Sequence, residues 1–172
     1  MPFLKTAAWV NFILIAVNAI AAPLFASLYA EKDFQGLQQL VSSIARWMFY
    51  PAFLVACGLI LFAEPLLQLF GTEFIAAKGA LIVLIFGQLV NVGVGSVGYL
   101  LMMSGHHQEC AKVMGWCTGV NIMLNLIGIP WLGILGAGIA TAVSMALWNI
   151  WLHRLVVRYL NINPSIVSAL GR

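Results

Sequence analysis

The hydropathy pattern divides the chain into long charge-free runs separated by short polar connectors. The longest run, from Val113 to Leu152, contains no Asp, Glu, Lys, Arg or His. A helix needs about 20 apolar residues to cross a bilayer, because each residue adds about 1.5 Å and the hydrocarbon is about 30 Å thick. The run is therefore long enough for two spans. We expect a break over Ile129–Gly133, where Pro130 lacks a backbone donor and Gly133 permits a turn, so the halves form a helical hairpin.

The same criterion predicts five transmembrane helices, over residues 6–29, 46–63, 79–104, 111–129 and 132–153. Each is a helix rather than an open strand, because backbone groups cannot stay unpaired in lipid. The expected fold class is all-α, a polytopic membrane helical bundle that forms one domain over residues 1–172.

The connector over residues 31–45 is amphipathic. Phe34, Leu37, Val41 and Ile44 recur at three- and four-residue spacing, with polar residues on the other faces. This pattern predicts a short interfacial helix that lies at the membrane surface. An ordinary polar connector is the alternative.

The first apolar run also permits a different interpretation. Lys5, the run itself and Ala19-Ile20-Ala21 before Ala22 have the order of a secretory signal with a cleavage site. A signal peptide normally precedes a soluble domain, whereas the sequence that follows here is apolar. We therefore favour a membrane span.

Composition supports the membrane assignment. The chain is 63% hydrophobic and 8% charged, with a mean hydropathy of +1.02, whereas soluble domains carry about 25% charged residues. The formal net charge of +3 is too small to indicate a nucleic-acid partner, so the expected partner is the lipid bilayer. The cysteines, Cys57, Cys110 and Cys117, form no CxxC pair and are expected to pack as small apolar side chains.

The basic residues predict the orientation in the membrane. With five spans, six of the eight Lys and Arg residues fall on one side, namely Lys32, Arg46, Lys112, Arg154, Arg158 and Arg172, and Lys5 and Lys78 fall on the other. Short cytoplasmic loops carry the excess of Lys and Arg. We therefore expect the C-terminus in the cytoplasm and the N-terminus outside.

The polar residues inside the predicted spans are mostly amides, and we take five of them as candidates for a transport pathway: Asn18, Gln88, Asn91, Asn121 and Asn125. One interpretation is that these amides form hydrogen bonds between helices, each worth about 0.6 kcal/mol. The other is that they line a neutral polar cavity, since sugars are uncharged and rich in donors and acceptors.

Small residues mark the expected helix-packing faces. Gly95 and Gly98 continue the face of Gln88 and Asn91, and two further pairs at four-residue spacing follow in the last span, Gly136/Ala140 and Gly138/Ala142. Small side chains let helix backbones approach closely in lipid.

The sequence shows no catalytic constellation. No span holds paired carboxylates, and there is no phosphate-binding loop. His106, His107, Glu109 and Cys110 lie close in sequence, but successive helical residues point about 100° apart and rarely converge on one metal ion. We predict no catalytic residue, no metal and no cofactor, and the chain is not expected to be an enzyme.

Three stretches carry a family resemblance. They are AAPLFASLYAEKDFQGLQQLVSSIARW, GQLVNVGVGSVGYLLMMSGHHQECAK and NIMLNLIGIPWLGILGAGIATAVS, the last with Asn121, Asn125, Pro130, Gly133, Gly136, Ala137, Ala140 and Thr141. In this order and spacing the chain resembles the late helices of bacterial polysaccharide flippases. These are the O-antigen and lipopolysaccharide-repeat exporters of the superfamily that includes the MATE drug exporters.

The resemblance implies a location and a function. Family members have about twelve or fourteen spans in two lobes, and the five spans here would correspond to spans eight to twelve, the C-terminal lobe without its first helix. It implies a bacterial inner-membrane protein that takes part in exporting a lipid-linked glycan by alternating access, with a missing N-terminal lobe or a partner membrane protein. Alone, the chain is not expected to transport. A MATE-like drug exporter fragment is one alternative, which an acidic group in the cavity would favour, and a non-transporting membrane scaffold is another.

Overall fold

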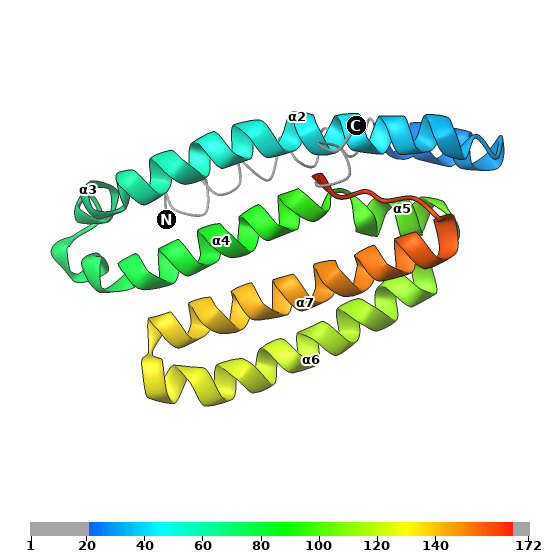
Figure 1. Cartoon of the computed structure of the whole chain (residues 1–172). Helices are drawn as coiled ribbons and strands as arrows, with labels where there is room; N and C mark the ends of the chain where they lie inside the picture. Colours follow the sequence, from blue (N-terminus) through cyan, green and yellow to red (C-terminus); the bar gives the residue numbers. More distant parts are fainter. Residues whose placement is uncertain (1–20, 167–172) are drawn as a thin grey trace.

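The computed structural model describes residues 21–166, all of whose regular structure is helical (Figure 1). A short helix over Ala21–Ala30 leads into a long helix, α2 (Phe34–Leu61). The remaining elements are α3 (Ala63–Gln68), the 3₁₀ helix η1 (Thr72–Ala77), α4 (Lys78–Val94), α5 (Val97–Met103), α6 (His107–Leu132) and α7 (Ile134–Leu160). The all-α fold class is confirmed for this part of the chain.

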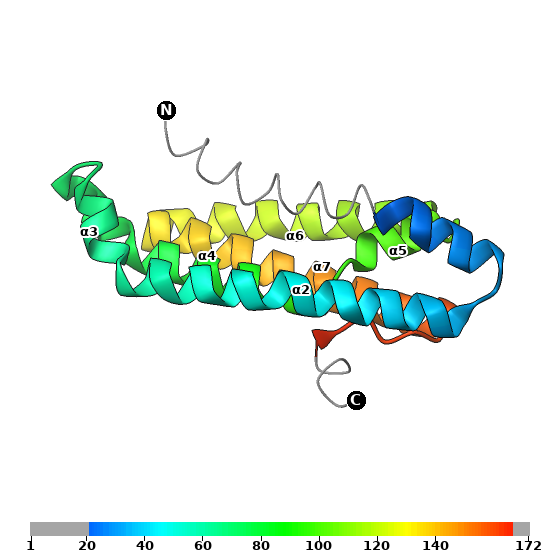
Figure 2. The ribbon, with the colours of Figure 1, turned by 90° about the horizontal axis from the view of Figure 1, so that it is seen from above.

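Four long helices form the body of the molecule. In Figure 1, α2, α4, α7 and α6 lie one below another in that order, so α7 has α4 on one side and α6 on the other. The view from above in Figure 2 shows the same four helices running side by side along their length. One end of the layer, the core end, holds residues 31–33, 104–106 and the start of the segment over 161–166, which runs back along the layer to the end of α4. The other, the hairpin end, holds α3, η1 and the turn between α6 and α7.

The described helices are apolar and long enough to cross a membrane at four places: Phe34–Leu61, Phe74–Val94, His107–Leu132 and Ile134–Leu160. The first predicted span, 6–29, lies mostly outside the described residues. Its described end belongs to the helix over Ala21–Ala30. The chain is thus a polytopic helical membrane protein by length and composition.

Residues 31–45 do not form a separate interfacial helix. From Phe34 onward they are the first half of α2, which continues without a break to Leu61 and contains Pro51. The Asp33 side chain caps the helix by accepting a hydrogen bond from Gly36 N at 2.9 Å. The apolar stripe faces protein rather than a membrane surface, because Leu37 and Val41 are buried in the main core.

The predicted span over residues 79–104 is interrupted. α4 ends at Val94, and α5 begins at Val97. Gly95 has a φ of +83°, and a Cβ at this position would lie 2.6 Å from the carbonyl oxygen of Pro164. The chain of residues 161–166 therefore comes so close that only glycine fits, and the helix breaks there.

The hairpin is present, and its turn lies at Gly133, the last residue of the predicted break over Ile129–Gly133. Pro130 is part of the last turn of α6, where its fixed φ is compatible with a helix. Gly133 has a φ of +57°, which supplies the reversal. α6 (His107–Leu132) extends beyond the predicted span of 111–129 at both ends, and α7 (Ile134–Leu160) extends beyond the predicted span of 132–153 at its C-terminal end.

Small residues hold the helices together from the hairpin end to the middle of the layer. A Cβ at Gly87 of α4 would lie 3.1 Å from the Cα of Ala142, and a Cβ at Gly138 of α7 would lie 3.1 Å from the Cα of Ala80. Gly136 lies directly against the backbone of Gly128 across the hairpin. Lipid provides no hydrophobic drive between helices, so such close backbone contacts must supply the attraction.

The large buried apolar side chains gather at the core end instead. Phe25, Leu37, Leu100, Leu152 and Val156 belong to one cluster that joins the helix over Ala21–Ala30, α2, α5 and α7. Cys110, Val113 and Cys117 bring α6 into the same cluster. Burial of apolar side chains stabilises a structure only where water is the alternative surrounding, which fits a core near the membrane surface.

The C-terminal segment over residues 161–166 fastens the core end. Ile162, Pro164 and Ile166 are buried. Gln38 Nε2 donates to the Asn163 carbonyl at 2.8 Å, and Asn163 N donates back to Gln38 Oε1 at 2.8 Å. This pair of hydrogen bonds ties the first turns of α2 to the far end of the chain.

Candidate functional site

The amides of α6 are joined to α7 by a short hydrogen-bonded chain. Asn125 Nδ2 donates to both the carbonyl and Oδ1 of Asn121, at 2.9 and 3.1 Å. Asn121 Nδ2 donates to Ser144 Oγ at 3.2 Å, and Ser144 Oγ donates to the Ala140 carbonyl at 2.7 Å. Asn121 therefore bridges the hairpin, and Asn125 is bonded to Asn121 within α6.

The amides of α4 are arranged differently. Asn91 Nδ2 donates to Gln88 Oε1 at 3.5 Å, so the contact between them stays within one helix. Gln88 is exposed and Asn91 is half-buried. A polar side chain exposed at mid-membrane depth suits either a wet cavity or a further helix.

The two amide pairs do not form one cluster, because α7 lies between α4 and α6 (Figure 1). Asn18 lies outside the described residues. Asn149, which was not predicted, is buried in α7 and donates to the Met145 carbonyl at 2.9 Å. Its signal in the sequence was the same as that of the other amides, whereas Ser144 gave no signal beyond a hydroxyl in an apolar run.

The predicted packing residues lie against different parts of the molecule. Gly138 and Ala142 lie against α4, and Gly136 lies against α6. Ala140 is buried. A Cβ at Gly95 would lie 2.6 Å from the Pro164 carbonyl oxygen and 3.8 Å from Ala45 Cβ of α2, and one at Gly98 would lie 3.9 Å from Leu152 Cδ1 of α7.

The histidine-rich loop has other partners. His106 stacks on Tyr159 with ring centroids 4.5 Å apart, and its Nδ1 lies 3.2 Å from Ser104 Oγ. Glu109 pairs with Lys112 at 2.8 Å. Among residues 21–166, no three His, Cys, Asp or Glu side chains lie where they would hold a metal ion.

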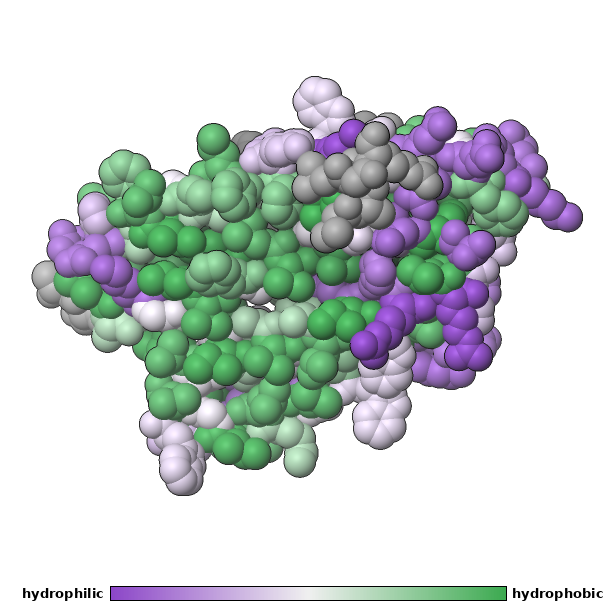
Figure 3. Space-filling view, in the orientation of Figure 1, coloured by the Kyte–Doolittle hydropathy of each residue, from purple (hydrophilic) through white to green (hydrophobic). Residues whose placement is uncertain are grey.

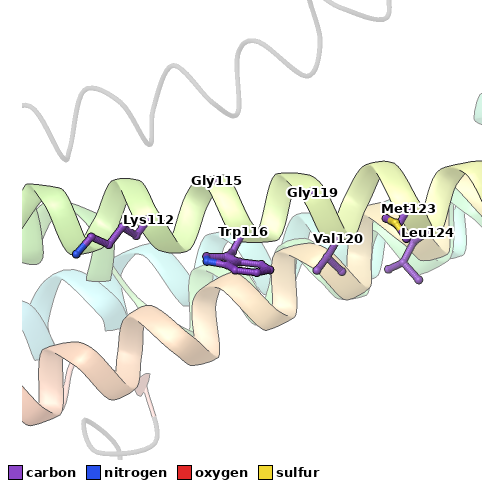
Figure 4. A pocket seen from close by; sticks show the side chains of 7 residues that line it. All are labelled: Lys112, Gly115, Trp116, Gly119, Val120, Met123 and Leu124. Carbon is purple, nitrogen blue, oxygen red and sulfur yellow. The ribbon is translucent and has the colours of Figure 1, made fainter.

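A shallow apolar groove of about 790 Å³ follows the outer face of α6. Figure 4 shows the lining residues that the structure describes, which belong to this helix: Lys112, Gly115, Trp116, Gly119, Val120, Met123 and Leu124. A Cβ at Gly115 or Gly119 would meet no atom within 4 Å. Among the lining residues that the structure describes, Lys112 and Trp116 carry the polar groups, and the others are glycine or apolar.

On α6 and α7, a charge-free stretch separates the cations near the core end from the hairpin turn. Lys112 and Trp131 lie about 28 Å apart along α6, and Gly133 and Arg154 about 31 Å apart along α7, at 1.5 Å per residue. No Asp, Glu, Lys or Arg lies between these limits on either helix. Figure 3 shows the corresponding apolar band across the surface, with hydrophilic residues at both ends. This spacing matches the thickness of bilayer hydrocarbon.

Comparison with known proteins finds a sequence similarity to a flippase. The chain is 27% identical over 141 residues to the probable low-salt glycan biosynthesis flippase Agl15 of the archaeon Haloferax volcanii. The match includes 79% of this chain and 29% of the relative, so the chain spans less than a third of the length of that protein. No family model matches the chain, and no solved structure matches it.

Proposed function

We propose that this chain forms part of a transporter that moves a lipid-linked oligosaccharide across the cytoplasmic membrane by alternating access. The observation that carries the proposal is the match to a glycan flippase along 79% of the chain. The apolar helices and the neutral amides are compatible with this substrate class. The matched relative is archaeal. The specific form of the proposal, a bacterial inner membrane and O-antigen-type repeat units, comes from the family resemblance of the sequence.

The proposed mechanism uses two lobes that rock about a central cavity. The described helices form a layer with one exposed amide at mid-depth, Gln88. In the proposal, Gln88 faces the substrate path, whereas Asn121 and Asn125 mainly hold the hairpin together. The chain performs no covalent step, and by itself it provides no complete path.

The proposed orientation places the core end in the cytoplasm. Lys32, Arg46, Lys112, Arg154 and Arg158 lie toward this end, and Lys78 lies at the hairpin end, paired with Glu64 at 2.9 Å. The excess of cations at one end supports a cytoplasmic location for it. A cysteine placed at position 161 and another at position 71 would be labelled from opposite sides by an impermeant maleimide.

The function is tested by disrupting the gene in its source organism. We expect lipid-linked oligosaccharide to accumulate and the mature surface glycan to disappear, with recovery when the gene is restored. Sensitivity to cationic drugs without a glycan change would instead indicate a drug exporter. An unchanged glycan with the loss of one bound membrane protein would indicate a scaffold.

A matched pair of variants tests the role of the amide. Gln88→Leu should reduce glycan export while leaving the protein as stable as wild type, because Gln88 is exposed. Val90→Leu, a change of exposed side chain on the same helix, should leave export unchanged. Normal export by Gln88→Leu would remove this residue from the proposed path.

A further inference from the structure

Cations and tryptophans occur together at one level of the bundle. A Cβ at Gly95 would lie 3.8 Å from Ala45 Cβ, and one at Gly98 would lie 3.9 Å from Leu152, which places α2 and α7 in register at this depth. Val113 of α6 belongs to the same core cluster as Leu152. The residues next to these contacts are three exposed pairs of cation and indole: Arg46 with Trp47, Lys112 with Trp116, and Arg154 with Trp151.

The α7 pair has a second cation. Trp151, Arg154 and Arg158 follow one another at three- and four-residue spacing, so they share one face of the helix, and all three are exposed. Within residues 21–166, the ion pairs are those of Lys78 with Glu64 and Lys112 with Glu109. The two arginines thus lack an acidic partner in the described part of the chain.

This face lies at the depth of lipid headgroups. Arg154 is about 31 Å along α7 from the turn at Gly133, counted at 1.5 Å per residue, which is close to one hydrocarbon thickness. Trp151 is 46% exposed and lies one turn deeper, where indoles favour the interface. Deeper still, Leu147 and Ile150 are exposed and apolar, as the surroundings of acyl chains require.

We propose that the face of α7 formed by Trp151, Arg154 and Arg158 binds the phosphate of an anionic phospholipid in the leaflet at the core end. Two guanidinium groups one turn apart repel each other unless an anion lies between them, and each offers paired N–H donors to phosphate oxygens. The apolar side chains below the cations favour a lipid over a soluble anion. The inference concerns the surrounding bilayer and does not depend on what the protein transports.

The test uses the full chain with Trp151 as its single tryptophan, the other five replaced by phenylalanine. The protein is reconstituted into phosphatidylcholine vesicles that contain increasing fractions of brominated phosphatidylglycerol or brominated phosphatidylcholine. Bromine quenches tryptophan on contact, so the quenching curves give the relative affinity of the two lipids at Trp151. A chain with Trp131 alone, at the hairpin end, is the matched reporter away from the cations.

We expect phosphatidylglycerol to associate about five- to thirtyfold more strongly than phosphatidylcholine at Trp151, since each of the two cations at an anionic surface contributes up to about fivefold. The ratio should be about one at Trp131. The double variant R154Q/R158Q should bring the Trp151 ratio to about one, and R154K/R158K should retain a preference. Quenching by brominated phosphatidylcholine alone should be equal in R154Q/R158Q and in the Trp151 chain from which it derives. Equal quenching shows that insertion into the bilayer is unchanged.

Three results would overturn the proposal. They are equal quenching by the two lipids at Trp151, an equal preference at Trp131, and a preference that survives R154Q/R158Q. Inorganic phosphate, added at constant ionic strength, should leave the ratio unchanged. A preference abolished by phosphate would show that the face takes a soluble anion rather than a lipid.

Discussion

The contact between α4 and α7 at Gly138 makes a quantitative prediction. A Cβ at Gly138 would lie 3.1 Å from both the Cα and the Cβ of Ala80, and 3.2 Å from its carbonyl oxygen. Ordinary carbon–carbon contacts are about 3.5–4.0 Å, so Gly138→Ala must move the two helices apart by about half an ångström. A gap of that size forfeits about a quarter of the dispersion attraction of neighbouring contacts. Overpacking costs about 1–3 kcal/mol, and alanine regains up to about 1 kcal/mol as a better helix former, so we expect a net destabilisation of about 1 kcal/mol.

The matched control is Gly119→Ala on α6, where the added methyl meets nothing within 4 Å. Alanine is a better helix former than glycine, so this variant should be as stable as wild type or up to about 1 kcal/mol more stable. The measurement is the midpoint of unfolding in dodecylmaltoside micelles as dodecyl sulfate is added, followed by far-ultraviolet circular dichroism. Equal midpoints for Gly138→Ala and wild type would refute the close helix contact. A destabilised Gly119→Ala would show that α6 packs against something on this face.

Three other substitutions test separate contacts. Gly95→Ala should destabilise the protein by about 3 kcal/mol in the same titration, because the methyl would meet the Pro164 carbonyl in a backbone conformation that alanine avoids. Asn121→Leu and Ser144→Ala should show a coupling energy of about 0.6 kcal/mol in a double-mutant cycle, and purely additive effects would contradict the hydrogen bond between them. Gln38→Ala removes a reciprocal pair of hydrogen bonds and should raise the rate of amide hydrogen exchange in residues 161–166, whereas unchanged exchange would show that buried apolar contacts alone hold this segment.

The sequence predicted the membrane helices well, because the cost of a charge in hydrocarbon leaves a direct record in the chain. The charge-free run from Val113 to Leu152 became the α6–α7 hairpin. The sequence predicted the segments between the membrane helices less well. The stripe of Leu37 and Val41 has the same spacing whether it faces a lipid surface or a protein core, so periodicity alone did not show that α2 is continuous.

The break at Gly95 was not predictable from local sequence. Glycine is common inside membrane helices, and the group that requires it here, the Pro164 carbonyl, is far along the chain. The separation of the two amide pairs was not predictable for a related reason. Their spacing along α4 and α6 identified the pairs, but only the placement of α7 between these helices shows that the pairs stay apart.

The hydrophobic cluster makes the bundle more rigid at the core end than at the hairpin end. Large interlocking side chains and the Gln38–Asn163 hydrogen bonds fix the helices at that end, whereas backbone-to-backbone contacts at small residues join them elsewhere. We therefore expect the helices to move less at the core end than at the hairpin end. If a helix tilts by about 10° about the core end, its opposite end moves by about 5 Å, because the hydrocarbon is about 30 Å thick. Spin labels should therefore report broader interhelical distance distributions at the hairpin end than at the core end.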